Sequence, residues 1–290
     1  MRLSFLPVFI LALVTSACAE IDASAPDIRR AGSQSTVTYC GSQKMDLSGR
    51  KGQGGSQAVI LYIHGGGWET GDRKGGFERR RLKPLVQNGF IVATLDYRLA
   101  PQHRHPAQIH DVKCAIKYLR HHGPALGIDS ERIGVMGDSA GGHLAALAAL
   151  TSPQDGLEGP NLAGVSSDVQ AAATFYGIFD LVNVEPHSLA VDAVTQNFPN
   201  RAARAQGSPI IYLDAADPPF LIVHGKQDRF VDIAQSVKLT IGLKNAGHAP
   251  LLVAVENAGH GLVARGGKPM PETETIDQLL VAFFTEHLAK

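Results

Sequence analysis

Short apolar runs alternate with stretches of helical character along most of this chain, and no other feature restricts its fold as strongly. Apolar runs of buried-strand length fall near residues 58–63, 90–95, 132–136, 169–174, 219–224 and 250–255. Helical segments lie near residues 76–88, 107–121, 140–150, 232–246 and 273–288. This order predicts an α/β fold with a mostly parallel central sheet and helices on both faces. Residues that follow its strands should then collect at one edge of the sheet.

Two further segments complete the predicted fold. An antiparallel hairpin is expected around residues 37–39 and 44–47, ahead of the first buried run. Residues 180–214 have weak periodicity and contain several prolines. We expect them to form an insertion that lies over the carboxyl edge of the sheet and shapes a pocket there.

A serine flanked by glycines follows one apolar run and precedes an Ala/Leu-rich segment. The motif is GDSAGG at residues 137–142, which puts Ser139 at the corner between a strand and a helix. Gly137 and Gly141 are required because any side chain there would collide with the neighbouring strand and helix. The pattern is typical of a nucleophile elbow, which lifts the serine hydroxyl clear of the sheet.

A glycine loop, HGGGW at residues 64–68, ends the first buried run. Consecutive glycines let backbone N–H groups turn toward a developing oxyanion, and the residue after the nucleophile supplies another donor. The predicted donors are Gly66, Gly67 and Ala140. Gly65 is a further candidate, because the sequence does not decide which two of the three glycine amides point inward.

An acid and a base follow the last two apolar runs. Asp228 comes just after the run near 219–224, and His260 just after the run near 250–255. A serine hydroxyl is a weak nucleophile until an imidazole takes its proton, and the imidazole needs a carboxylate to fix its tautomer. Ser139, Asp228 and His260 are therefore the predicted catalytic residues, in the chain order of α/β-hydrolases.

The other histidines and acids near these motifs receive structural interpretations. Asp232, the nearest rival to Asp228, is expected to cap the helix that follows it. We expect His224 to make a structural hydrogen bond, and His64 and His143 to buttress their loops. No metal ligation is expected, since no His or Cys pair stands at zinc-ligand spacing in a suitable context.

Together these motifs resemble those of α/β-hydrolase esterases close to the hormone-sensitive-lipase-like group and the bacterial feruloyl/acetylxylan esterase-like (BD-FAE-like) group. The similarity runs from about residue 57 to residue 260 and also includes LDYRLAP (95–101), PAQ (106–108) and PPF (218–220). The resemblance implies a carboxylic-ester hydrolase of the α/β-hydrolase fold. It also implies that the enzyme needs no metal or organic cofactor and acts on short acyl esters such as acetylated or feruloylated carbohydrate.

Carried over motif by motif, the resemblance makes Ser139 the nucleophile, Asp228 the orienting acid and His260 the general base. The chain departs from the family at Lys226-Gln227, where related esterases commonly carry an acidic residue. We interpret this departure as a change of loop charge that leaves Asp228 in its role.

Two alternative functions, and the role of one aromatic residue, are not decided by the sequence. A prolyl-oligopeptidase-like serine peptidase would share the motifs, but it usually carries a large propeller domain for which this chain has no room. A non-catalytic binding module on a hydrolase fold would normally have lost a catalytic residue or the glycine loop. Trp68 could stack on a sugar ring or pack in the interior.

The first 19 residues have the pattern of an export signal. Arg2 precedes an apolar run, residues 3–14, which is too short to span a bilayer and is followed by TSACA. Release after Ala19 is favoured, although cleavage after Ala17 would leave Cys18 as a lipidated first residue on a membrane. We expect residues 20–290 to form a single domain of the secreted or periplasmic protein.

Export makes the two remaining cysteines relevant. A disulfide between Cys40 and Cys114 is permitted in an oxidising compartment. Cys114, however, lies in an amphipathic segment, residues 111–119, where a half-buried thiol packs well without a partner. The sequence therefore leaves the pairing of the two thiols open and favours free thiols over a disulfide.

Charge and length limit the remaining choices. The 27 basic and 27 acidic residues balance, so no nucleic-acid partner is indicated, and the expected partner is a small-molecule or polysaccharide ester. The one dense basic run, RRRLK at residues 79–83, is expected to be a solvated helix face with Leu82 and Leu85 turned inward. Oligomeric state is not predicted.

Overall fold

The computed structural model describes residues 35–49, 55–185 and 187–289; the expected export signal at residues 1–19 lies outside them. The described residues form an eight-stranded sheet in the order β1-β2-β4-β3-β5-β6-β7-β8. β1 pairs antiparallel with β2 and β2 with β4, and the remaining pairs are parallel. The strands are β1 (Ser35–Tyr39), β2 (Gln43–Ser48), β3 (Gln57–Ile63), β4 (Ile91–Leu95), β5 (Ile128–Asp138), β6 (Ala171–Phe175), β7 (Phe220–Gly225) and β8 (Leu251–Val255).

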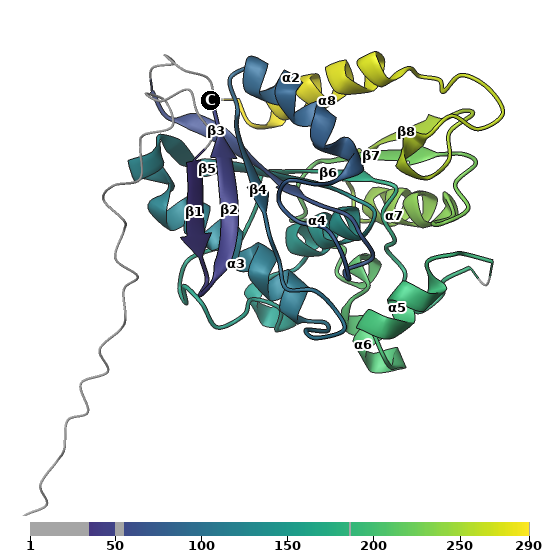
Figure 1. The fold of residues 1–290 in the computed structure, drawn as a ribbon, viewed down its shortest axis with the longest axis horizontal. Coiled ribbons are helices and arrows are strands. Elements are labelled where there is room, and N and C mark those ends of the chain that lie inside the picture. The colour runs from purple at the N-terminus through teal and green to yellow at the C-terminus, as the bar shows by residue number, and fades with distance from the viewer. Residues whose placement is uncertain (1–34, 50–54, 186, 290) are drawn as a thin grey trace, which may run out of the picture.

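Helices cover both faces of the sheet (Figure 1). One face carries α2 (Leu82–Gln87) and α8 (Thr273–His287), and the other carries α3 (Ala107–His122), α4 (Ala140–Leu150) and α7 (Ala234–Asn245). The period-two alternation of β3 explains both layers: Val59 and Leu61 pack into the core under the second group, and Ile60 and Tyr62 pack under the first. Such burial on both faces is why the strands read as continuous apolar runs.

Every predicted strand and helix has a counterpart within a few residues, and the N-terminal hairpin is confirmed as β1 and β2. The helix expected near residues 76–88 is divided into a 3-10 helix, Phe77–Arg81, and α2.

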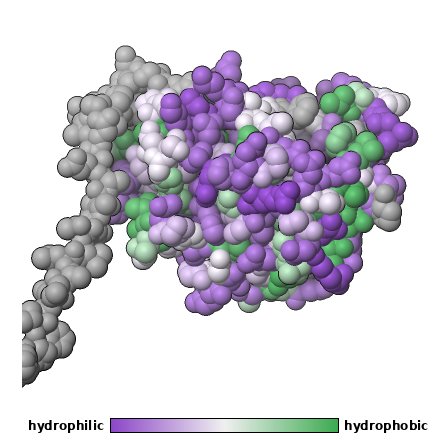
Figure 2. Space-filling view, turned by 60° about the horizontal axis from the view of Figure 1, so that its bottom comes forward, coloured by the Kyte–Doolittle hydropathy of each residue, from purple (hydrophilic) through white to green (hydrophobic). Residues whose placement is uncertain are grey.

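The face in Figure 2 is mostly hydrophilic, and its apolar residues form separate small groups. Within the described ranges, none of the helices is long and apolar enough to cross a membrane.

The expectation that favoured free thiols is wrong. Cys40 and Cys114 form a disulfide, with their Cα atoms 6.2 Å apart. Cys40 follows β1, and β1 lies against α3, which carries Cys114. The contact between β1 and α3 forms only when the chain folds, so the helical pattern around Cys114 could not predict it.

Reduction of the disulfide should lower stability substantially. Its two cysteines are 74 positions apart, and closing a loop of that size stabilises a folded chain by about 4 kcal/mol in the chain-entropy account. We expect thermal unfolding of the oxidised protein to shift to lower temperature in dithiothreitol. The double variant Cys40→Ser/Cys114→Ser should show the same lowered midpoint and no response to reductant. Equal midpoints for oxidised and reduced wild type would contradict the expectation.

The basic run at residues 79–83 also differs from its prediction in one residue. Leu82 and Leu85 are buried as expected, but Arg81 is buried too. Its guanidinium is ion-paired with Glu78 and Asp277, and two carboxylates offset the cost of burying one cation. Arg81 therefore joins the 3-10 helix to α8 instead of facing solvent.

Candidate active site

Ser139 occupies a strained corner between β5 and α4. Its backbone lies in the left-handed region, with φ 53° and ψ −117°, which a side-chain-bearing residue adopts at a cost. A Cβ atom on Gly137 would overlap the Gly141 carbonyl, and one on Gly141 would overlap the Ile63 carbonyl. The Ser139 N–H donates to the Phe175 carbonyl at 2.9 Å, which ties the corner to β6. The requirement for both glycines is thus confirmed.

The structure brings Ser139, His260 and Asp228 together at the carboxyl edge of the sheet. His260 Nε2 lies 3.1 Å from Ser139 Oγ, and His260 Nδ1 lies 2.7 Å from Asp228 Oδ2. Asp228 Oδ1 accepts from the backbone N–H groups of Phe230 (2.8 Å) and Val231 (3.0 Å). Burial would raise the pKa of Asp228, but hydrogen bonds from His224 and His260 outweigh it and hold that pKa well below its ordinary range. The carboxylate is therefore ionised and fixed in orientation.

The rival acid lies elsewhere. Asp232 Oδ1 accepts from the Ala234 N–H at 2.8 Å, so its side chain holds the first residue of α7, although the N-cap residue of that helix is Ile233. Asp232 Oδ2 lies 3.1 Å from Nε2 of His187, an exposed histidine. Asp228 and not Asp232 faces His260.

The glycine loop after β3 is built around a buried carboxylate. The backbone of Gly65 lies against Asp138 and acts to lower the pKa of that carboxyl. Gly66 and Gly67 have φ values of +112° and +62°, which favour glycine. Ala140 is the first residue of α4, so its N–H is one of the helix-terminal donors without an intrahelical acceptor. Gly66, Gly67 and Ala140 thus remain the candidate oxyanion donors, and Gly65 remains a further candidate.

Two buried histidines buttress the loop, as predicted. His64 Nδ1 lies 2.7 Å from the Gly65 carbonyl oxygen, and its ring stacks on Tyr97. The Trp68 indole N–H donates to His143 Nδ1 at 3.2 Å, and His143 Nε2 donates to the Gly207 carbonyl at 2.6 Å. Burial lowers the pKa of His143 to about 3, so the ring stays neutral. Trp68 is 2% exposed, which decides between its two interpretations in favour of packing.

A cleft of about 900 Å³ opens over Ser139 and His260. Its walls are largely apolar, and the insertion predicted at residues 180–214 supplies Leu189, Ala190 and Ala193. The rest of its outer wall includes Phe230, Val231, Val263, Ala264 and Arg265. The expectation that residues 180–214 shape the pocket is confirmed.

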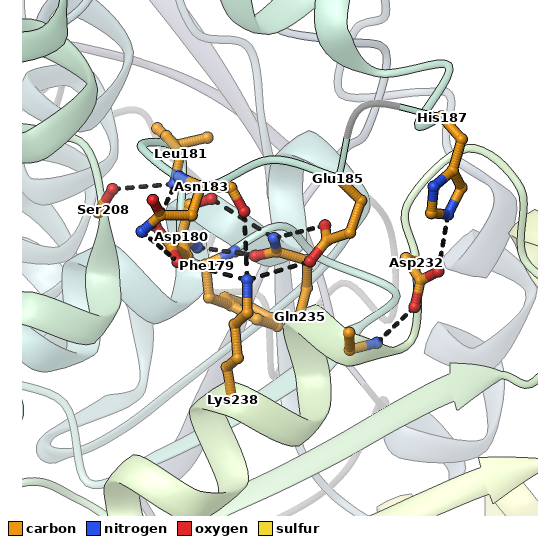
Figure 3. Close-up of polar contacts among 11 residues, drawn as sticks. Phe179, Asp180, Leu181, Asn183, Glu185, His187, Ser208, Asp232, Gln235 and Lys238 are labelled. Atoms are coloured by element: carbon orange, nitrogen blue, oxygen red, sulfur yellow. Dashed lines mark hydrogen bonds and ion pairs between the residues drawn. The ribbon is translucent and has the colours of Figure 1, made fainter.

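That insertion is fastened to α7 by polar side chains (Figure 3). Gln235 Oε1 accepts from the N–H groups of Phe179 (2.9 Å) and Asp180 (2.8 Å). Lys238 Nζ lies 3.0 Å from Glu185 Oε1 and 3.4 Å from Asp180 Oδ2. One helix therefore holds the beginning of the segment that covers the cleft.

Three residues that contact the site have no role that the sequence motifs predict. Asp138 lies beside Ser139 in GDSAGG, and its carboxylate also accepts from the Tyr62 hydroxyl. Phe230 and Tyr176 place their rings 5.3 Å and 4.7 Å from the His260 ring. Asp138 could have been noticed from its place in the motif, whereas the two aromatic contacts depend on how the loops fold.

The buried carboxyl of Asp138 predicts a pH effect on stability. Burial raises its pKa from 3.8 to about 6 despite the hydrogen bond from Tyr62. Between these values the folded protein keeps a proton that the unfolded chain has lost, so the free energy of unfolding falls as pH rises through this window. The fall attributable to Asp138 should be about 3 kcal/mol.

Denaturant unfolding of wild type and Asp138→Asn at pH values from about 4 to 7 measures this effect. The substitution adds a constant difference of its own, but the wild type should lose stability relative to the variant as pH rises. Two curves that stay parallel over the whole range would show that Asp138 does not titrate there.

A mostly parallel sheet with serine at a strand-to-helix corner, and an acid and a histidine after its last two strands, defines an α/β-hydrolase. The BD-FAE family matches residues 45–243, well over half of the chain. The chain belongs to the BD-FAE family.

Individual relatives agree with this membership. Esterase LipQ of Mycobacterium tuberculosis is 34% identical over 211 residues, which cover 70% of this chain and 49% of LipQ. The chain spans about half the length of such curated relatives. A truncated carbohydrate esterase from gut microbiota superposes with a TM-score of 0.76 at 26% identity, covering 92% of this chain and all of that one. Butyrate-bound esterase 2 of Thermogutta terrifontis gives 0.74 at 26% identity, covering 91% and 97%.

Proposed function

We propose that this protein is a serine carboxylic-ester hydrolase that works through an acyl-enzyme intermediate. The observation that carries the proposal is the continuous hydrogen-bonded row from Asp228 through His260 to Ser139, with distances of 2.7 Å and 3.1 Å. These are the contacts through which an imidazole activates a serine. The esterases among its relatives support the same reaction class.

The proposed reaction consists of two acyl transfers. His260 takes the hydroxyl proton of Ser139 as its oxygen attacks the ester carbonyl, and the amides of Gly66, Gly67 and Ala140 stabilise the oxyanion. The protonated imidazole then gives this proton to the departing alcohol, which leaves an acyl-serine. Water, deprotonated by the same imidazole, attacks that ester, and the acid is released as the serine recovers its proton.

We further propose short acyl esters of carbohydrates, acetylated or feruloylated, as the substrates. The apolar walls of the cleft, with Phe230 and Leu189 among them, support an acyl group that is not charged. A volume of about 900 Å³ leaves room for an aromatic acyl group as well as for acetate. The carbohydrate esterase among the structural relatives supports a sugar alcohol.

Initial rates on a panel of esters test both the proposed ester hydrolysis and the proposed carbohydrate substrates. The panel contains p-nitrophenyl acetate, butyrate and octanoate together with acetylated xylan and methyl ferulate. Fast cleavage of the acetate, with acetate or ferulate released from the last two substrates, is the expected result. A preference for octanoate would replace the carbohydrate substrates with lipid-like esters. No hydrolysis of any ester by the folded protein would contradict the proposal as a whole.

Export to an oxidising compartment is also proposed, with release after Ala19 favoured over lipidation at Cys18. The Cys40–Cys114 disulfide supports this location, because disulfides persist mainly outside the reducing cytosol. Mass spectrometry of the protein produced with its own N-terminus tests the cleavage site. A mass that retains residues 1–19 would contradict export.

A further inference from the structure

A second histidine touches the carboxylate of Asp228. His224 lies near the end of β7, and its side chain is fully buried. Its Nδ1 lies 2.7 Å from Ser236 Oγ, and its Nε2 lies 2.9 Å from the Val231 carbonyl oxygen. The same Nε2 is 3.3 Å from Asp228 Oδ2, the oxygen that also faces His260.

The partners of His224 define where its hydrogen lies. A carbonyl oxygen only accepts hydrogen bonds, so Nε2 carries a hydrogen and donates it to Val231, with Asp228 Oδ2 beside it at 3.3 Å. Nδ1 faces the hydroxyl of Ser236, which can donate to the lone pair of this nitrogen. Ser236 is itself buried in the first turn of α7, next to Gln235, which holds the cleft-covering segment. The Nε2–H of His224 therefore lies against the carboxylate of Asp228.

Each carboxylate oxygen of Asp228 has two N–H groups beside it. Oδ1 accepts from two backbone N–H groups, and Oδ2 accepts from His260 Nδ1 and lies 3.3 Å from His224 Nε2. The hydrogen bond from His224 is the foremost influence that lowers the pKa of Asp228 against the effect of burial. Asp232 is the other carboxylate near His224, and it is engaged with Ala234 and His187. The charge of Asp228 thus depends on His224 as well as on His260.

We propose that His224 is a positioning residue for the ester hydrolysis, with Ser236 fixing its tautomer. It lies against Asp228 Oδ2, the oxygen that faces His260 Nδ1, and so keeps that oxygen in place. The row of side chains then extends the proposed triad from α7 to the cleft: Ser236, His224, Asp228, His260 and Ser139. This inference rests on the proposed function.

Replacement of His224 by phenylalanine keeps a ring in the space and removes the donor. We expect kcat on p-nitrophenyl acetate to fall about 10- to 100-fold, the loss typical of one hydrogen bond to a charged group, with KM within about twofold. The acid limb of the kcat/KM profile should move to higher pH, because a carboxylate with one donor fewer holds the His260 proton more strongly. His224→Gln, which keeps a side-chain N–H, should recover part of kcat. Ser236→Ala should show a smaller loss in the same direction.

The matched control is His122→Phe, since His122 is also buried but lies at the end of α3. This variant should keep the wild-type kcat and acid limb. The decisive measurement is a double-mutant cycle with Asp228→Asn. If His224 acts through Asp228, His224→Phe should cause little further loss in the Asp228→Asn background. Additive losses in kcat, or an unmoved acid limb, would overturn the proposal and leave His224 a packing residue.

Two failures can be told apart. Wild type without esterase activity, or Ser139→Ala with full activity, would refute the proposed function itself. An active wild type, an inactive Ser139→Ala and a folded His224→Phe with unchanged kcat would refute only the role of His224. If circular dichroism shows that His224→Phe does not fold, the double-mutant cycle and the pH profile are measured with His224→Gln and Ser236→Ala instead.

Discussion

Ser139→Ala is expected to lower kcat on p-nitrophenyl acetate by about 10⁵- to 10⁶-fold, as in serine hydrolases that lose their nucleophile. Ser139 Oγ lies 3.1 Å from His260 Nε2, and alanine removes that oxygen alone. Alanine leaves the Ser139 N–H bond to Phe175 in place, so the fold should be retained. Initial rates beside circular dichroism spectra of both proteins measure the two effects.

A serine-directed organophosphate gives an independent readout of the same residue. Wild type should gain one covalent adduct on the peptide that contains Ser139, and Ser139→Ala should gain none. Ser152→Ala is the matched control, since Ser152 lies after α4 in a local turn with Asp155. Wild-type turnover by folded Ser139→Ala, or an adduct on another serine, would remove Ser139 from the role of nucleophile.

Asp228→Asn is expected to slow hydrolysis by about 10⁴-fold, the loss that accompanies a wrongly held imidazole tautomer. The Asp228 carboxylate accepts from His260 Nδ1 at 2.7 Å, which leaves Nε2 free to take the serine proton. An asparagine can turn its NH₂ toward Nδ1 and stabilise the opposite tautomer. The effect should fall on kcat with little change in KM, measured with p-nitrophenyl acetate at fixed pH.

Asp232→Asn is the paired control, because it changes the same functional group four residues away. Asp232 contacts the start of α7 and not His260, so this variant should keep wild-type kcat within about twofold. Its stability should change little, because an asparagine oxygen can accept the same hydrogen bond from the Ala234 N–H. If Asp232→Asn were the slow variant and Asp228→Asn the fast one, the assignment of the acid would be reversed.

The sequence allows the sheet and the serine corner to be predicted because their requirements are local. Ser139 needs glycines on both sides, and each buried strand needs a run of apolar side chains for its two packed faces. Asp228 and His260 could be found because parallel strands bring their carboxyl ends to one edge. Position along the chain then implies position in space.

Features that depend on distant partners could not be predicted in this way. The Cys40–Cys114 disulfide joins positions 74 apart, and the ion pair from Arg81 to Asp277 joins positions 196 apart. Neither spacing has a local pattern, so a half-buried thiol and a solvated arginine were reasonable expectations. The contact of the Gly65 backbone with Asp138 likewise forms only when the chain folds.

The hydrogen bonds of His143 limit how this enzyme can diverge. One ring nitrogen accepts from Trp68 in the glycine loop, and the other donates to the Gly207 carbonyl in the segment that covers the cleft. A covering segment grafted from another esterase would have to bring a carbonyl to the same point, or leave a buried imidazole N–H without an acceptor. Changes of substrate preference should therefore accumulate more readily by exchanging side chains on the cleft wall than by exchanging whole loops.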